Sequence, residues 1–141
     1  MAARRSILIA DDEFGLADML REMLGEYDYD VTLAINGRLA LDILRERRVD
    51  VVITDLMMPV MDGLELAAVM RASATLRGIP IILMTSLPSE PKGTELYDAV
   101  LRKPFTPELL LSTVNDCFAR IPDQPSGEGD NSPEPNQAEP S

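Results

Sequence analysis

The stretch Val51-Val52-Ile53-Thr54-Asp55 decides the fold of this chain. Its β-prone residues follow one another without polar alternation, a pattern typical of a strand buried on both faces of a parallel sheet. Asp55 stands at the end of this strand, just before a turn at Leu56-Met57-Met58-Pro59. Ligands of open α/β sheets bind outside the carboxyl ends of the strands, so Asp55 is a candidate functional residue. Taken alone, an aspartate in such a place is more often a simple loop or cap residue.

The length and composition favour one globular domain. The chain has 141 residues, of which 45% are apolar and 26% charged, enough for one full core. Its net charge of −11 argues against nucleic acid as a direct partner, because nucleic-acid-binding modules need a basic face. It has no histidine and one cysteine, which excludes zinc sites built from these residues, histidine-containing triads and disulfide frameworks. Any metal is then a hard cation held by oxygen: magnesium, manganese or calcium.

The amino terminus does not predict a signal peptide or a membrane segment. Met1–Arg5 carries two positive charges, but the apolar stretch Ile7–Ala10 that follows is far too short for a secretion signal. No apolar run reaches membrane-spanning length. We therefore expect a soluble, cytoplasmic protein without a membrane partner.

Short apolar segments alternate with segments of helical periodicity, which predicts an α/β fold with a doubly wound parallel sheet. The expected strands cover residues 6–10, 31–34, 51–54, 81–85 and 99–102.

The expected helices carry recognisable start signals. The first begins at Phe14, the second follows Asn36 as N-cap, the third covers about Leu64–Ala72, and the last opens at Thr106-Pro107. We expect the apolar stripes of the first and last helices to be core, namely Leu16, Leu20, Met23 or Leu24, and Tyr27 in the first, and Leu110, Val114, Cys117 and Ile121 in the last.

The end of the chain differs in composition from the rest. Residues 122–141 hold five prolines and five acidic residues, no basic residue, and one alanine as the only apolar group. Such a segment cannot bury enough apolar surface to order itself. We predict one domain over residues 1–121 and a disordered tail or linker over residues 122–141.

Four of the expected strands end in residues that can do chemistry: Asp11-Asp12, Asp55, Thr85 and Lys103. The first strand of such a sheet usually neighbours the third, so the three carboxylates are expected to converge. Like charges at short range are costly unless a cation neutralises them, and carboxylate oxygens with water suit magnesium.

This constellation predicts phosphoryl chemistry. A carboxylate beside magnesium is a plausible phosphoryl acceptor, because nucleophilic aspartates form acyl phosphates. Lys103 offers a charge to one phosphoryl oxygen, and the Thr85 hydroxyl offers a hydrogen bond to another. The alternative is a set of solvated loop residues in which Lys103 pairs with an acid. That alternative suits any one residue but not all of them at the ends of four strands.

Four stretches together resemble the receiver domain of two-component response regulators, over roughly residues 5–121. They are Ile-Leu-Ile-Ala-Asp-Asp-Glu (7–13), Val-Ile-Thr-Asp-Leu-Met-Met-Pro-Val-Met-Asp-Gly (52–63), Pro-Ile-Ile-Leu-Met-Thr-Ser (80–86) and Arg-Lys-Pro-Phe (102–105). The resemblance implies a flavodoxin-like sheet with the strand order 2-1-3-4-5, the order of a chemotaxis member of that family.

The resemblance also implies an acceptor and a metal site. Asp55 should accept a phosphoryl group from a phosphohistidine on a histidine kinase or histidine phosphotransfer protein. Asp12, Asp55 and the backbone carbonyl of Met57 should ligate Mg²⁺, with Mn²⁺ as a substitute, while Asp11 acts mainly through water.

The remaining motif residues should position and report the phosphoryl group. Lys103 should contact it, with a cis peptide bond to Pro104 aiming the lysine, and Thr85 should move toward it. The resemblance assigns Met58-Pro59 and Asp62-Gly63 to shaping the loop after the acceptor.

The sequence departs from the family between Thr85 and Lys103. Val100 stands where the family has a switching aromatic, and Tyr97 is on a different register, more simply a partly buried aromatic. The spacing is about one helical turn short, and Pro88, Pro91 and Gly93 disfavour a regular helix there. We expect a shortened or irregular fourth helix, and hypothesise that phosphorylation orders or shifts residues 86–98. A static shortened loop is the alternative.

The sequence thus predicts a phosphoacceptor signalling domain that switches binding to an unknown downstream protein. It would not be an enzyme beyond Mg²⁺-dependent self-phosphorylation and autodephosphorylation.

The second hypothesis is a phosphorylation-independent adaptor, although such proteins typically lose one or more of the site residues. An aspartyl-phosphate hydrolase is weaker, because Met57 stands where such enzymes have a second carboxylate. The tail offers no output domain, so we expect a stand-alone regulator or a receiver from a larger protein.

Overall fold

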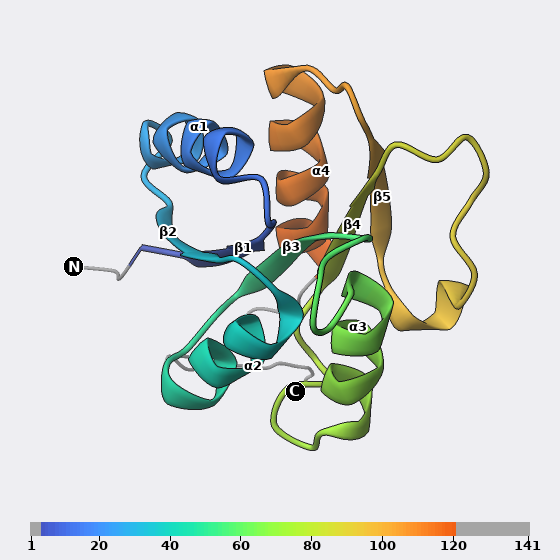
Figure 1. Cartoon of the computed structure of the whole chain (residues 1–141). Helices are drawn as coiled ribbons and strands as arrows, with labels where there is room; N and C mark the ends of the chain where they lie inside the picture. Colours follow the sequence, from blue (N-terminus) through green and yellow to red (C-terminus); the bar gives the residue numbers. More distant parts are fainter. Residues whose placement is uncertain (1–3, 121–141) are drawn as a thin grey trace, which may run out of the picture.

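The computed structural model describes residues 4–120, and these form a parallel sheet flanked by helices (Figure 1). The sheet has five strands in the order β2-β1-β3-β4-β5 among the described residues, which confirms the expected fold class. The strands are β1 (Ser6–Ala10), β2 (Asp30–Ala34), β3 (Val51–Asp55), β4 (Ile81–Thr85) and β5 (Ala99–Arg102). No helix within residues 4–120 combines the length and the apolar character that crossing a bilayer requires.

The alternation of side chains along β3 gives the molecule two cores. Val52 packs with one cluster, against α2 (Gly37–Glu46) and α3 (Gly63–Ala72). Val51 and Ile53 pack with the other, against α1 (Phe14–Gly25) and α4 (Pro107–Arg120). Figure 1 shows these helix pairs on opposite sides of the sheet. Because both faces are covered, the strand has no polar alternation.

The strand register brings the polar strand ends to one edge of the sheet. Ala10 pairs with Thr54, Asp55 pairs with Met84, and Thr85 pairs with Arg102. The residues after β1 and β5 therefore lie beside the end of β3 and β4.

Side-chain caps fix where the helices begin. The Asn36 carboxamide oxygen accepts a hydrogen bond from the Leu39 amide at 2.8 Å, and the Thr106 hydroxyl accepts one from the Leu109 amide at 3.0 Å. Both confirm the predicted starts. The third helix begins at Gly63, slightly earlier than predicted, where Asp62 and Glu65 form a capping box.

One core prediction is wrong, and a second, for Leu16, holds only in part because Leu16 is half-buried against the core. Tyr27 does not lie on the inner face of α1, because the helix ends at Gly25 and Tyr27 is 58% exposed in the following turn. Ala17, Leu20 and Leu24 form the buried face instead. Cys117 is buried as predicted. Ile121 and the predicted tail over residues 122–141 lie outside the described residues.

Residues 86–98 contain no α-helix, only a 3₁₀ turn over Thr94–Leu96 that follows Gly93 in the left-handed region, at φ 78°. This confirms the prediction that the helix expected between Thr85 and Lys103 is shortened or irregular. Tyr97 is buried and donates a hydrogen bond to the Pro91 carbonyl oxygen. It is therefore a core aromatic, in agreement with its simpler interpretation.

Arg71 anchors the second half of this segment to α3. Its guanidinium donates to the Leu96 carbonyl oxygen at 2.9 Å and pairs with the Asp98 carboxylate at 2.8 Å. It also donates to the carbonyl oxygens of Arg77 and Ile79. The first half of the segment, residues 86–90, is exposed.

Candidate functional site

A carboxylate cluster, defined as Asp11, Asp12 and Asp55, lies at the carboxyl edge of the sheet with Lys103 beside it. The Lys103 Nζ atom is 3.5 Å from Asp55 Oδ1 and 3.6 Å from Asp11 Oδ2. Asp11 is buried, Asp12 is exposed and Asp55 is half-buried. The structure thus brings together the carboxylates and the lysine that the sequence singled out.

The cluster has the chemistry of a hard-cation site. Each of the three residues offers an oxygen, and these oxygens lie within 4.8 Å of one another. Asp11 Oδ1 accepts a hydrogen bond from the Glu13 amide at 2.9 Å, but its buried Oδ2 atom has no hydrogen-bond partner. A buried carboxylate oxygen whose charge is offset only by the Lys103 ammonium 3.6 Å away, and which accepts no hydrogen bond, is costly, and a divalent cation, directly or through water, would satisfy it. The donor set therefore fits Mg²⁺ or Mn²⁺.

Burial raises the pKa of the Asp55 carboxyl above its ordinary value, and the negative charges of Asp11 and Asp12 raise it further. The Lys103 ammonium opposes this rise through its charge and a hydrogen bond. One lysine thus offsets only part of the unfavourable environment. The site favours added positive charge.

Thr85 and Pro104 lie where the sequence placed them. Thr85 is buried, and its Oγ1 atom accepts a hydrogen bond from the Leu87 amide at 3.0 Å. The Lys103 amide donates to the Thr85 carbonyl oxygen at 2.8 Å. The Lys103–Pro104 peptide bond is cis, which confirms that prediction. The Met57 side chain is 69% exposed.

Gly63 closes the loop that follows Asp55. Its amide donates to the Leu56 carbonyl oxygen at 2.9 Å. A Cβ atom at position 63 would lie 2.3 Å from the Asp55 carbonyl oxygen, inside van der Waals contact. The absence of a side chain therefore allows α3 to start directly behind the backbone of Asp55.

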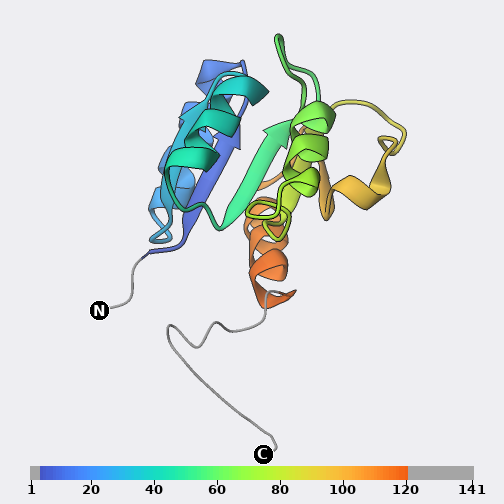
Figure 2. The ribbon, with the colours of Figure 1, turned by 90° about the horizontal axis from the view of Figure 1, so that it is seen from below.

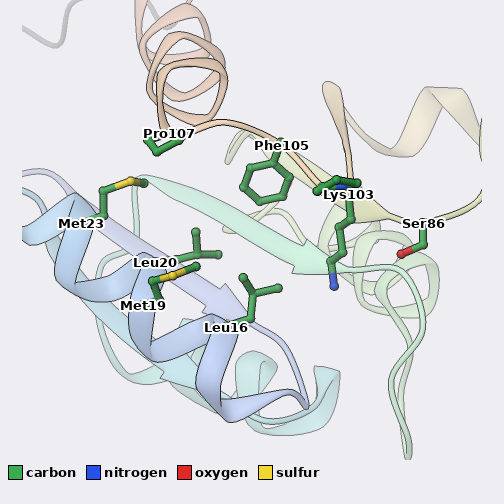
Figure 3. A pocket seen from close by; sticks show the side chains of 9 residues that line it. Leu16, Met19, Leu20, Met23, Ser86, Lys103, Phe105 and Pro107 are labelled. Carbon is green, nitrogen blue, oxygen red and sulfur yellow. The ribbon is translucent and has the colours of Figure 1, made fainter.

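An apolar groove next to Lys103 was not predicted. Figure 3 shows α1 side chains facing Phe105 and Pro107 across it, with Lys103 at one end. The groove encloses about 660 Å³ and is lined by Leu16, Met19, Leu20, Met23, Ser86, Lys103, Pro104, Phe105 and Pro107. Leu16 and Met23 are thus half-buried groove residues rather than full core. The sequence signal for the groove was Met19, which is exposed. It makes the apolar stripe of the first helix wider than the residues that face the core require.

The comparisons with known proteins agree with this geometry. Residues 7–115 match the model of the response regulator receiver domain. The chain is 34% identical over 133 residues to the DNA-binding response regulator MtrA of Mycolicibacterium paratuberculosis, a match that covers 87% of this chain and 55% of MtrA. It is 36% identical over 127 residues to the response regulator MprA of Mycolicibacterium vanbaalenii, covering 86% of this chain and 54% of MprA. The chain thus spans about half the length of these curated relatives.

Solved structures of receiver domains are also similar to this chain. The chemotaxis response regulator CheY4 of Vibrio cholerae superposes with a TM-score of 0.74 at 32% identity, covering 81% of this chain and 98% of CheY4. The signal receiver domain of a histidine kinase from Syntrophus aciditrophicus superposes with a TM-score of 0.76 at 33% identity, covering 83% and 92%.

Replacing Gly63 with alanine is expected to destabilise the protein by about 2 kcal/mol or more, because the new Cβ must displace the backbone behind Asp55. Urea denaturation measures the effect. Gly15→Ala is the matched control, since a Cβ atom added at this position of α1 would meet nothing within 4 Å, and it should be neutral or stabilising by up to about 1 kcal/mol. Equal stability of Gly63→Ala and wild type would show that the loop accommodates a side chain.

Replacing Asp55 with asparagine is expected to stabilise the metal-free protein at pH 7. The raised pKa of Asp55 means that its ionised form opposes folding, so the cost is present above that pKa. The gain should shrink as pH falls through the raised pKa and should be lost at about pH 3, below the unfolded-state pKa of about 3.9, because the carboxyl is then protonated in both folded and unfolded states. Denaturation with a chelator present at both pH values tests this.

The half-exposed Asp42, paired with Arg38 on α2, supplies the control. Asp42→Asn should change the stability by less than about 0.5 kcal/mol at either pH. A metal-free Asp55→Asn variant less stable than wild type at pH 7 would contradict the sign of the prediction.

Proposed function

This chain belongs to the response regulator receiver family of two-component signalling, and from that premise we propose that Asp55 is its phosphoacceptor. The observation that carries the proposal is the position of the Lys103 ammonium, 3.5 Å from Asp55 and 3.6 Å from Asp11. In the transfer, an Asp55 carboxylate oxygen forms a bond to phosphorus while the bond from phosphorus to the donor's histidine nitrogen breaks. The nitrogen keeps the electron pair.

We assign the surrounding residues supporting roles. Asp12, Asp55 and the Met57 carbonyl would hold Mg²⁺, or Mn²⁺ in its place, and Asp11 would act on it mainly through water. When bound, the cation neutralises charge on the carboxylates and the incoming phosphoryl group. Lys103 pairs with a phosphoryl oxygen, and the Thr85 hydroxyl donates a hydrogen bond to another. The hydrogen bond from the Lys103 amide to the Thr85 carbonyl oxygen keeps these two residues side by side.

The phosphoryl donor is a histidine kinase or a histidine phosphotransfer protein. Such a donor must present an exposed surface around its phosphohistidine, and the groove offers an apolar surface for docking beside Lys103. Exposed apolar groups gain free energy when they leave water on docking. We therefore place part of the donor interface on α1 and on the loop between β5 and α4.

The same residues disfavour the other hypotheses. A phosphorylation-independent adaptor would not need Asp11, Asp12, Asp55, Thr85 and Lys103 together. The family is not one of enzymes with a separate substrate, so the chemistry proposed is self-phosphorylation from a donor and autodephosphorylation. MtrA is named as DNA-binding, but the match covers about half of MtrA, and the net charge of −11 here argues against direct DNA contact.

The output is a change in residues 86–98, which recognise a downstream protein. The Thr85 hydroxyl joins the site to this segment, because it accepts from the Leu87 amide. Turning that hydroxyl toward a phosphoryl group on Asp55 would break this bond and release the exposed residues 86–90. Arg71 holds Leu96 and Asp98, so the second half stays in place.

Intact mass spectrometry after incubation with acetyl phosphate and Mg²⁺ tests the acceptor. We expect one phosphoryl adduct in wild type, none in Asp55→Asn, and none when a chelator removes the cation. Asp42→Asn, which changes a half-exposed aspartate on α2, should still be labelled. If neither acetyl phosphate nor several phosphohistidine donors labels wild type, the adaptor hypothesis replaces this one.

Amide hydrogen exchange with and without an acyl-phosphate mimic tests the output. Exchange should change within residues 86–93, where one hydrogen bond to Thr85 is expected to be lost. It should stay constant within residues 94–98, where Arg71 binds. Unchanged exchange over the whole of residues 86–98 would favour a static loop and defeat the proposed switch.

A further inference from the structure

Val60 adopts a backbone conformation that suits its residue type poorly. Its φ is 72°, and the Met61 amide donates to the Pro59 carbonyl oxygen at 2.7 Å across it. This is a γ-turn whose central residue has a positive φ, a rare and strained turn. For a β-branched residue, positive φ is a genuine outlier. Glycine or asparagine would adopt this conformation with less strain.

Most of the Val60 side chain lies in water rather than against its own chain. It is 80% exposed, the most exposed of the large hydrophobic side chains in residues 4–120. Its neighbours are held firmly, because the Gly37 amide donates to the Met61 carbonyl oxygen at 3.0 Å and Gly63 closes the loop on Leu56. The loop therefore fixes an apolar side chain in water.

The position of Val60 suggests what compensates for this arrangement. Figure 2 shows the loop between β3 and α3 projecting beyond the ends of the strands, at the edge where the carboxylate cluster lies. The loop leads to α3 on one face of the sheet, whereas the apolar groove involves α1 on the other face. A protein that brings a phosphohistidine to Asp55 must therefore approach between the groove and the loop.

We propose that Val60 is a specificity-determining residue for the phosphohistidine-bearing donor protein. Its isopropyl group inserts into an apolar depression beside the donor's phosphohistidine, and the strained turn holds that group outward before docking. This inference rests on the proposed function, because it needs Asp55 to be the phosphoacceptor. It adds a contact that a small phosphodonor such as acetyl phosphate cannot use.

The test compares two donors on the same variants. One is the autophosphorylated catalytic core of the histidine kinase, from a panel of the source organism, that phosphorylates wild type fastest. The other is acetyl phosphate with Mg²⁺. For Val60→Gly and Val60→Asn, the ratio of the kinase rate to the acetyl phosphate rate should fall about five-fold, as expected for losing a partly buried apolar contact.

Stability provides an independent readout. Val60→Gly and Val60→Asn should unfold at a higher urea concentration than wild type or at the same one, so a lower transfer ratio cannot be attributed to misfolding. Tyr27→Ala is the matched control, because Tyr27 is 58% exposed and lies in the turn after α1, away from the carboxylate cluster. Its ratio should remain that of wild type.

Each other outcome counts against a defined claim. An unchanged ratio for both Val60 variants would overturn the assignment, as would an equal fall in Tyr27→Ala. Labelling by acetyl phosphate without transfer from any kinase in the panel would also overturn it, while leaving Asp55 as a phosphoacceptor. Failure of acetyl phosphate to label wild type would remove the proposed function itself.

Discussion

The crowding of negative charge at the carboxyl edge of the sheet is the constraint on which the rest of the structure depends. Asp11, Asp12 and Asp55 place oxygens within 4.8 Å of one another, with one lysine ammonium beside them. Such an arrangement opposes folding electrostatically, so it persists only because the hydrophobic strands that end there are buried on both faces. The two hydrophobic cores thus offset the electrostatic cost of the site, as the surrounding structure commonly does at functional sites.

The fold and much of the site followed from short-range sequence patterns. Val51–Asp55 and the other unbroken apolar runs predicted buried parallel strands, and Asn36 and Thr106 marked helix starts through local capping. The convergence of Asp11, Asp55, Thr85 and Lys103 followed from parallel strands sharing one edge. The cis bond before Pro104 and the strand order came from the family resemblance, since neither is encoded in periodicity.

The features that escaped prediction depend on contacts distant in sequence. Tyr27 fits the helical spacing of α1, but the helix ends earlier, and periodicity alone does not locate that end. The apolar groove needs α1 and the residues around Phe105 to face each other across a gap, which no single segment encodes. The prolines predicted that no regular helix forms between Thr85 and Lys103. The hydrogen bonds by which Arg71 holds this irregular segment could not be predicted from the residues next to Arg71 in the sequence.

Arg71 has a consequence for how this chain can diverge. Three of its hydrogen bonds go to main-chain carbonyl oxygens, of Leu96, Arg77 and Ile79, and one goes to the Asp98 side chain. Any residue type offers the same carbonyl, so mutations at the first three positions leave the anchor chemically intact. The side chains of this region can therefore change in the course of evolution while the hydrogen bonds that attach its main chain to α3 are kept.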